Sequence, residues 1–264
     1  MIKIFTVDAF TDTPFTGNPA AVCIPDNEIS DLLMQKIAFE MNLSETAFLK
    51  KRNDGFGLRW FTPESEVELC GHATLAGAHI LWQENIIPES HEAVFHTVYK
   101  GVLKAVKNGN EITLNFPANN PAVSDGNEIL SKALNVNPVN VFVTDNHYLV
   151  ELSSETELRK VNPDFNLLKT LTKYGTILTC RSANPEFDFV SRFFAPSKGV
   201  DEDPVTGSAH CVLAPYWSDK LGRKKLNAFQ ASERGGKLTV EISGDRVFIS
   251  GKAVTIIKGE FFPV

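Results

Sequence analysis

The sequence predicts an α+β protein made of two pseudo-symmetric halves, each a curved, mostly antiparallel sheet around a central buried helix. Three observations predict this architecture: motifs that occur twice, many short segments with strand-like alternation, and two glycine-led runs that are apolar on nearly every side. The chain has 264 residues, of which 43% are hydrophobic, and this suffices for a substantial core.

The clearest repeat begins at an arginine that is followed by aromatic residues. Segment 59–63 reads Arg-Trp-Phe-Thr-Pro, and segment 192–196, which starts 133 positions later, reads Arg-Phe-Phe-Ala-Pro. Gly71 and Gly207 then open two apolar runs 136 positions apart, so the second copy carries three extra residues and with them the acidic segment 201–203. Further landmarks recur in the same order: Phe95 with Phe229, Gly101 with Gly235, and the hairpin-type turn at Gly109 with that at Gly244. Ordered matches indicate one structural plan used twice.

Local patterns predict the elements between these landmarks. Alternating segments rich in β-branched residues predict strands at 3–10, 56–61, 102–106, 112–116, 139–143, 176–179 and 237–242. Amphipathic spacing predicts a helix at 29–42, with Leu32, Leu33, Ile37 and Met41 on one face, and another at 163–174. The runs after Gly71 and Gly207 predict the buried central helices. Segment 117–126 is typical of a linker, so we predict halves at 1–118 and 119–253, with 254–264 a candidate to complete the first half.

Composition narrows the class of protein. A net charge of −6 and the lack of a Lys/Arg run argue against nucleic acid as a partner. No stretch reaches the roughly 18 apolar residues of a membrane span, the N-terminal residues alternate like a strand rather than a secretory signal, and the four cysteines are scattered. We therefore expect a cytoplasmic protein without a disulfide framework, a membrane anchor or a zinc framework.

Cofactor motifs are also missing from the sequence. No Gly-x-Gly-x-x-Gly follows the first strand, no Gly-x-Ser-x-Gly elbow occurs, and no His-x-x-x-His or Cys-x-x-Cys spacing exists. We therefore expect neither a nucleotide cofactor nor a metal.

Glu45 is the first candidate for chemistry. It lies at a predicted helix-to-strand junction among apolar and β-branched residues. Most carboxylates are exposed, so a solvated loop glutamate is one interpretation. The other is a partly desolvated general base, whose pKa of roughly 4.3 would have to rise towards neutrality.

The two glycine-led helix starts are the second candidate. Helix N-termini offer unpaired N–H groups and about half a positive charge, so Gly71 and Gly207 mark two places suited to a substrate carboxylate or a developing enolate. The alternative is that both glycines only permit a tight turn and that His72 is an ordinary core histidine. Their recurrence in both halves favours function, with Ser208 beside the second start.

Three carboxylates at 201–203 precede the second helix start. Capping explains one of them more naturally than three. Pro204 keeps Asp203 out of helical geometry, so its side chain is free to point away from its own helix, and we predict that it orients and acidifies His72.

Taken together, four motifs resemble the PhzF-like phenazine-biosynthesis isomerase family, which has the diaminopimelate epimerase-like fold. They are Asp-Ala-Phe at 8–10 with Phe-Thr-Gly-Asn-Pro-Ala-Ala-Val at 15–22, Leu-Ser-Glu-Thr-Ala-Phe at 43–48, Cys-Gly-His-Ala-Thr at 70–74, and Glu-Asp-Pro-Val-Thr-Gly-Ser-Ala at 202–209. The resemblance covers nearly the whole chain. It implies two similar halves, an active site between them, a homodimer and no cofactor.

The resemblance also implies roles for particular residues. The family's catalytic glutamate, histidine, aspartate and serine fall on Glu45, His72, Asp203 and Ser208, and the residues implied in substrate binding are Asn18, Gly71, Ala73 and Gly207. In the phenazine enzyme the glutamate moves a proton between carbons of a dihydro-hydroxyanthranilate ring. The expected function is therefore a cofactor-independent isomerase of a small anionic metabolite, with Glu45 as the proton carrier.

Two alternatives remain beside the isomerase. One is a non-catalytic protein on the same fold that binds or senses a small ligand. The other is a racemase or epimerase with two catalytic cysteines, but this chain offers Cys70 at the first such position and Pro204 at the second. The sequence does not name the substrate, the pathway or the role of Cys70.

Overall fold

The computed structural model describes residues 1–124, 128–171, 173 and 175–262. The chain divides into two compact units, Met1–Asn115 with Ile249–Val264 and Phe116–Phe248. The division falls three and five residues before the boundaries expected from the linker and the C-terminal segment. In the segment 254–264, residues 263 and 264 lie outside the described part.

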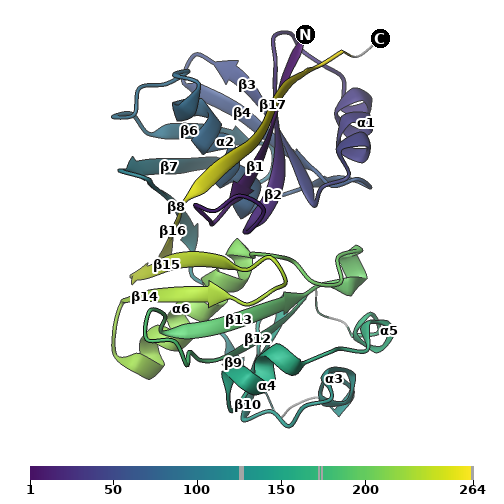
Figure 1. The fold of residues 1–264 in the computed structure, drawn as a ribbon, viewed down its shortest axis with the longest axis vertical. Coiled ribbons are helices and arrows are strands. Elements are labelled where there is room, and N and C mark those ends of the chain that lie inside the picture. Colours follow the sequence, from purple (N-terminus) through teal and green to yellow (C-terminus); the bar gives the residue numbers. More distant parts are fainter. Residues whose placement is uncertain (125–127, 172, 174, 263–264) are drawn as a thin grey trace. The chain divides into compact units, whose positions relative to one another are not determined.

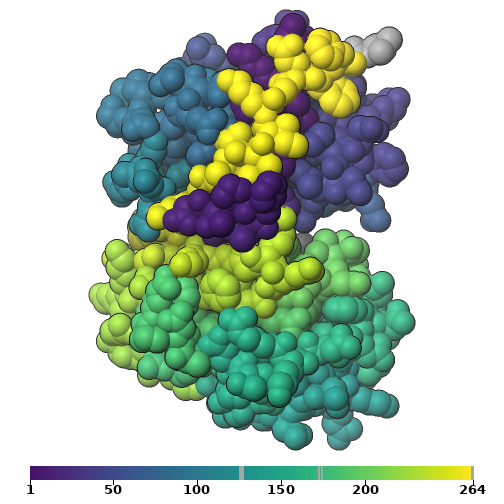
Figure 2. Space-filling model, viewed as in Figure 1, coloured from purple at the N-terminus to yellow at the C-terminus, as the bar shows by residue number. Residues whose placement is uncertain are grey.

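The first unit is a mostly antiparallel sheet with its two ends of chain side by side. The N-terminal strand β1 (Ile2–Ala9) pairs with both β2 (Asn18–Pro25) and the C-terminal strand β17 (Ala253–Phe261). Figures 1 and 2 show this pairing as a yellow C-terminal strand lying against purple N-terminal residues. The sheet continues through β3 (Glu45–Arg52), β4 (Gly55–Phe61), β6 (Ala93–Thr97), β7 (Val102–Asn108) and β8 (Glu111–Pro117), with the short β5 (Glu66–Val67) beside β4.

Two pairs of strands in this unit are parallel, and a helix connects each pair. Between β2 and β3 runs α1 (Asp31–Met41), and between β4 and β6 runs α2 (Gly71–Gln83). A parallel neighbour requires such a crossover because a tight hairpin can join only antiparallel strands. Helix α2 is buried over ten of its thirteen residues, as the apolar run predicted.

The second unit repeats this plan. Its strands are β9 (Ala122–Val123), β10 (Asn140–Val143), β11 (His147–Glu151), β12 (Gly175–Arg181), β13 (Phe189–Phe194), β14 (Lys225–Gln230), β15 (Gly236–Ser243) and the first half of β16 (Arg246–Gly251), whose residues from Ile249 on belong to the first unit. The parallel pairs are β11 with β12 and β13 with β14. The helices are α3 (Glu128–Leu134), α4 (Glu155–Lys160), α5 (Phe165–Leu168) and α6 (Gly207–Leu221), with a 3₁₀ turn at Pro196–Lys198.

The two units therefore share strand order, pairing direction and the position of the buried helix. In each unit, an antiparallel pair of strands is followed by two parallel pairs, and helices connect the two strands of each parallel pair. Helices α2 and α6 both connect the second parallel pair. The predicted fold class, two similar halves with mostly antiparallel sheets around central helices, is confirmed. The turns at Gly109 and Gly244 both adopt a φ of +60°, the left-handed conformation that glycine supplies.

The first predicted helix, 29–42, is shorter than expected and its face differs. Ser30 caps α1 by accepting from the Leu33 N–H, and Asn42 ends it in a left-handed conformation. Leu32 is 66% exposed, whereas Ile37 and Ala38 are buried. The prediction that Leu32 shares the buried face is therefore wrong.

The second predicted helix, 163–174, is largely wrong. Only Phe165–Leu168 forms α5, because the turn then tightens: the Thr170 and Leu171 N–H groups donate to the carbonyls three residues earlier. Residues 172 and 174 lie outside the described part of the chain.

The linker prediction also needs correction. Segment 117–126 contains β9, which pairs with Phe142 and Val143 of β10, so part of it belongs to the sheet. Gly126 lies outside the described residues.

Candidate functional site

The first unit gathers three polar side chains around His72, and we call the four residues the His72 cluster: Asn18, Glu45, Cys70 and His72. Asn18 is the first residue of β2 and Glu45 the first residue of β3, and these parallel strands are neighbours, with Ala20 opposite Glu45. His72 lies in the first turn of α2, which packs on β2 and β3. The fold thus brings two strand starts and one helix start together.

The imidazole of His72 is held between an amide and a carboxylate. Its Nε2 lies 3.3 Å from Oε2 of Glu45, and its Nδ1 lies 3.2 Å from Nδ2 of Asn18. His72 is only 5% exposed and Asn18 is fully buried. The two ring nitrogens are therefore committed to different partners.

Burial decides the protonation of His72. Desolvation lowers the pKa of His72 to about 3, so the imidazole is neutral at pH 7 and its contact with Glu45 is not an ion pair of two charges. An amide Nδ2 can only donate, so Nδ1 accepts and the single ring proton belongs on Nε2, facing the carboxylate. This tautomer follows from the Asn18 amide as it is oriented here.

Cys70 completes the cluster from the residue that precedes α2. Its Sγ lies 3.4 Å from Nδ1 and 4.0 Å from Nε2 of His72. Glu45, Cys70 and His72 each offer one possible metal-ligand atom, and these three atoms lie within 4.8 Å of one another. The sequence does not predict this grouping, because its local pattern is only Cys-x-His and the third residue, Glu45, is distant in sequence.

The starts of α2 and α6 resemble each other and differ from those of the helices that have a side-chain cap. Cys70 and Thr206 are the N-cap residues, both extended, and neither side chain bonds to the helix start. By contrast, Ser30, Ser154 and Asp164 each accept from a backbone N–H of their own helices. Gly71 and Ala73, and in the second unit Gly207, therefore lie in first turns that no N-cap side chain covers.

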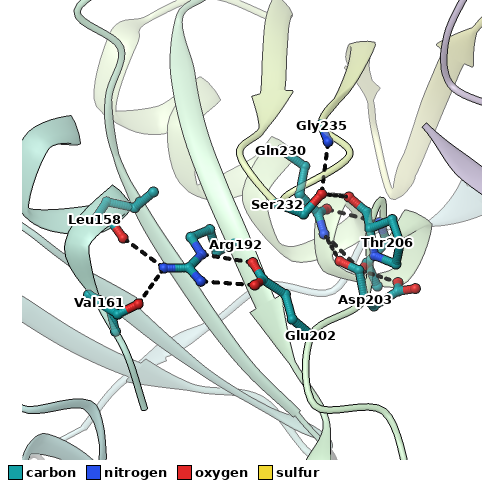
Figure 3. Close-up of polar contacts among 10 residues, drawn as sticks. Leu158, Val161, Arg192, Glu202, Asp203, Thr206, Gln230, Ser232 and Gly235 are labelled. Atoms are coloured by element: carbon teal, nitrogen blue, oxygen red, sulfur yellow. Dashed lines mark hydrogen bonds and ion pairs between the residues drawn. The ribbon is translucent and has the colours of Figure 1, made fainter. Parts of the chain in front are cut away.

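In the second unit, the start of α6 is anchored by a network around Gln230 (Figure 3). Gln230 accepts from the Thr206 N–H at 2.9 Å and donates to the Asp203 carbonyl at 2.7 Å. Ser232 donates to the Pro204 carbonyl at 2.8 Å. Strand β14 and the turn after it thereby fix the approach to the helix.

Asp203 and Ser208 both lie at this helix start. The Asp203 carboxylate accepts a hydrogen bond from the Thr206 hydroxyl, so it stays beside its own helix, and the expectation that Pro204 turns it away is wrong in this respect. Ser208 is exposed in the first turn of α6. The roles foreseen for Asp203 with His72, and for Ser208, remain predictions.

The other acidic neighbour, Glu202, has a structural role. It receives two parallel hydrogen bonds from Arg192, at 2.7 and 2.9 Å, as Figure 3 shows. In the first unit Arg59 makes the same bidentate contact with Glu66, at 2.7 and 2.8 Å. The arginine repeat thus marks a repeated ion pair, which sequence spacing does not reveal because the glutamate follows the arginine by 7 residues in one unit and by 10 in the other.

Comparison with known proteins agrees with this architecture. The family model described as "Phenazine biosynthesis-like protein" matches residues 7–259. An uncharacterized isomerase of Halalkalibacterium halodurans is 49% identical over 259 residues, covering 97% of each chain. A crystal structure of a phenazine biosynthesis protein of the PhzF family from Enterococcus faecalis has a TM-score of 0.95 at 39% identity and covers 99% of each chain.

A more distant structure shows how widely the fold extends. A hydroxyproline epimerase from Agrobacterium vitis has a TM-score of 0.66 at 11% identity, with coverage of 98% of this chain and 91% of its own, and so shares the fold alone. The fold class is therefore the epimerase-like fold with two similar halves. Within it, the chain belongs to the phenazine biosynthesis-like, or PhzF, family. Among the described residues, no helix is long and apolar enough to cross a membrane.

Proposed function

We propose that the protein is a cofactor-independent isomerase that moves a proton between carbons of a small, carboxylate-bearing substrate. The observation that carries the proposal is the Glu45 carboxylate, 3.3 Å from Nε2 of a buried, neutral His72. Glu45 removes a proton from one carbon, the electron pair moves into a conjugated enolate, and the protonated Glu45 returns the proton to another carbon. Substrate and product are isomers, so no other reactant is consumed.

His72 supports this role because it holds the carboxylate without competing for the proton. Its pKa of about 3 makes protonation of the ring unfavourable at neutral pH. The Nε2–H that faces Glu45 can orient the carboxylate in a fixed direction, as second groups do for catalytic acids and bases generally. Asn18 supports the same tautomer from the other side of the ring.

The uncapped starts of α2 and α6 support binding of an anion. Backbone N–H groups at a helix start carry partial positive charge and suit a carboxylate or a developing enolate. In this proposal Gly71, Ala73 and Gly207 offer backbone donors, Ser208 offers a hydroxyl, and Asp203 acts with His72. The Halalkalibacterium halodurans relative, named an isomerase, supports the reaction class. We also propose that the protein is a homodimer, as the resemblance implies, and that it is cytoplasmic, as we expect from its composition.

The experiment is a screen for proton exchange. Small carboxylated enols, dienes and amino acids are incubated with the enzyme in deuterium oxide, and loss of C–H signals is followed by proton NMR. We expect Glu45→Gln, which keeps the shape but cannot carry the proton, to lower turnover by about 10²–10⁴-fold. Full turnover by Glu45→Gln would refute the proposal.

Two competing functions give different outcomes. Binding of a ligand without any exchange by the wild-type protein, across the whole panel, would favour a non-catalytic binding protein. A two-cysteine racemase would lose activity on replacement of Cys70 and would invert a stereocentre. The second thiol is not offered at position 204, which is proline.

A further inference from the structure

We propose that Cys70, His72 and Glu45 form a binding site for Zn²⁺, and that Zn²⁺ bound there inhibits the protein reversibly. The binding itself stands on the geometry of the first unit. The inhibition rests on the proposed function, since the ion would occupy the carboxylate that carries the proton.

The distance between His72 and Glu45 suits two ligands of a tetrahedral ion, and the Cys70 thiol lies nearby. Nε2 of His72 lies 3.3 Å from Oε2 of Glu45 and 4.0 Å from Sγ of Cys70. Zinc bonds of about 2.3 Å to sulfur and about 2.0–2.2 Å to nitrogen or oxygen place neighbouring tetrahedral ligands roughly 3.3–3.6 Å apart. Sγ of Cys70 lies nearer Nδ1, at 3.4 Å, so the Cys70 side chain has to turn towards the Nε2 side of the ring before three protein ligands meet one ion.

The set of donors selects the kind of metal. A thiolate and an imidazole favour Zn²⁺ and other thiophilic ions, whereas Mg²⁺ and Ca²⁺ require oxygen ligands in greater number. Sites with three protein ligands leave a fourth position for water or another small ligand. This group is the one cluster of at least three His, Cys, Asp or Glu ligands found among residues 1–124, 128–171, 173 and 175–262.

The surroundings hold two of the ligands in place before the ion arrives. Cys70 and His72 are 6% and 5% exposed and flank the first residue of α2. The Thr74 hydroxyl donates to the Cys70 carbonyl at 2.6 Å, which fixes the backbone at this point. The backbone that carries these two ligands is therefore ordered before the ion binds.

Binding of the ion changes the hydrogen bonds of the ring. Zn²⁺ bonds to Nε2, so the ring proton moves to Nδ1, and the Cys70 thiol loses its proton to the buffer. Nδ1–H then needs an acceptor, and the Asn18 amide supplies one when it turns its Oδ1 towards the ring. Zinc-bound histidines generally donate their second N–H in this way.

Direct binding is tested with Cd²⁺ as the probe, because a cadmium–thiolate bond gives an ultraviolet charge-transfer band. We expect a band that saturates at one Cd²⁺ per chain, disappears in Cys70→Ala and is displaced by added Zn²⁺ but not by Mg²⁺. Cys211→Ala, which removes another buried thiol, is the matched control and should keep the band. Circular dichroism of each variant checks that it is folded.

The other two ligands are tested by affinity. Glu45→Gln and His72→Ala should keep the thiolate band but weaken Cd²⁺ binding at least about tenfold, because each removes one ligand. A saturating band that persists in Cys70→Ala, or its complete lack in the folded wild-type protein, overturns the site.

Inhibition is measured separately on the proton-exchange reaction, with Zn²⁺ added and then removed by a chelator. Loss and full recovery of exchange support the inhibitory role, and unaltered exchange at saturating Zn²⁺ overturns it. Because the cadmium band needs no substrate, failure of the metal site and failure of the isomerase assignment are distinguishable.

Discussion

At the scale of single residues, Asn18 is the group that fixes how His72 faces Glu45. Its Nδ2 lies 3.2 Å from Nδ1, inside the unit and away from water, so no solvent molecule replaces it readily. A hydrogen bond in such a place contributes about 1–3 kcal/mol when its loss leaves a buried group unpaired. Asn18 is thus a positioning residue for the proposed proton transfer.

We expect Asn18→Leu to lower kcat about 5–150-fold, which corresponds to the same 1–3 kcal/mol, while KM changes less. Nitrogen NMR of His72 supplies a readout that mere loss of stability would not move. The wild-type ring should carry its proton on Nε2, and the variant should show a mixture of tautomers. An exposed amide in the second unit, removed in Asn227→Ala, serves as the control.

The sequence predicts Asn18, Glu45 and His72 as site residues, but it does not predict the contact between Asn18 and His72. Glu45 and His72 were predicted because each stands at a recognisable junction, before a strand and after a helix-opening glycine. That Asn18 meets the same imidazole depends on the parallel register of β2 and β3 and on the packing of α2 over them. Such long-range pairing leaves no mark on neighbouring residues.

At the scale of elements, the arginine motif that occurs twice in the sequence forms a bidentate ion pair in each unit. Arg192 is 11% exposed and also donates to the carbonyls of Leu158 and Val161, which joins the end of α4 to β13. Arg59 is 24% exposed, and its other acidic partner, Asp31, lies largely in water. The arginine–glutamate pair is therefore more buried and makes more contacts in the second unit.

We expect Arg192→Met to lower the free energy of unfolding by about 2–4 kcal/mol, because Glu202 and two backbone carbonyls lose their hydrogen-bond donor. Arg59→Met should cost about 1–2 kcal/mol, since water reaches its partners more easily. Urea unfolding of both variants beside the wild type measures the difference. Equal losses at the two sites would contradict this ranking.

Elements also explain why the halves differ in chemistry. Strands β3 and β12 occupy equivalent places in the two units. Strand β3 starts with Glu45, whereas β12 starts with Gly175. A Cβ at Gly175 would lie 2.3 Å from the Phe193 ring, so that place has no room for a carboxylate. The prediction of a helix at 163–174 is wrong for a different reason, because the spacing of apolar residues does not show where a helical turn tightens and ends.

At the scale of the whole molecule, both units bury imidazoles in their neutral form. Burial lowers the pKa of His72 to about 3 and lowers the pKa values of His147 and His210 to about 4. In the unfolded chain these groups have a pKa of about 6.5. Below that pH the unfolded state therefore binds more protons than the native state.

Stability should consequently be fully present above pH 6.5 and fall as the pH drops towards 4. Each of the three groups contributes a slope approaching about 1.4 kcal/mol per pH unit within this window. The interval from pH 6.5 to 5 is the most informative, because carboxylates titrate mainly below it. Urea unfolding at a series of pH values gives the slope, and His210→Asn should reduce it by about one group's share, whereas the exposed His91→Asn should not. An unfolding free energy that stays constant from pH 6.5 to 5 would show that these rings are protonated alike in both states.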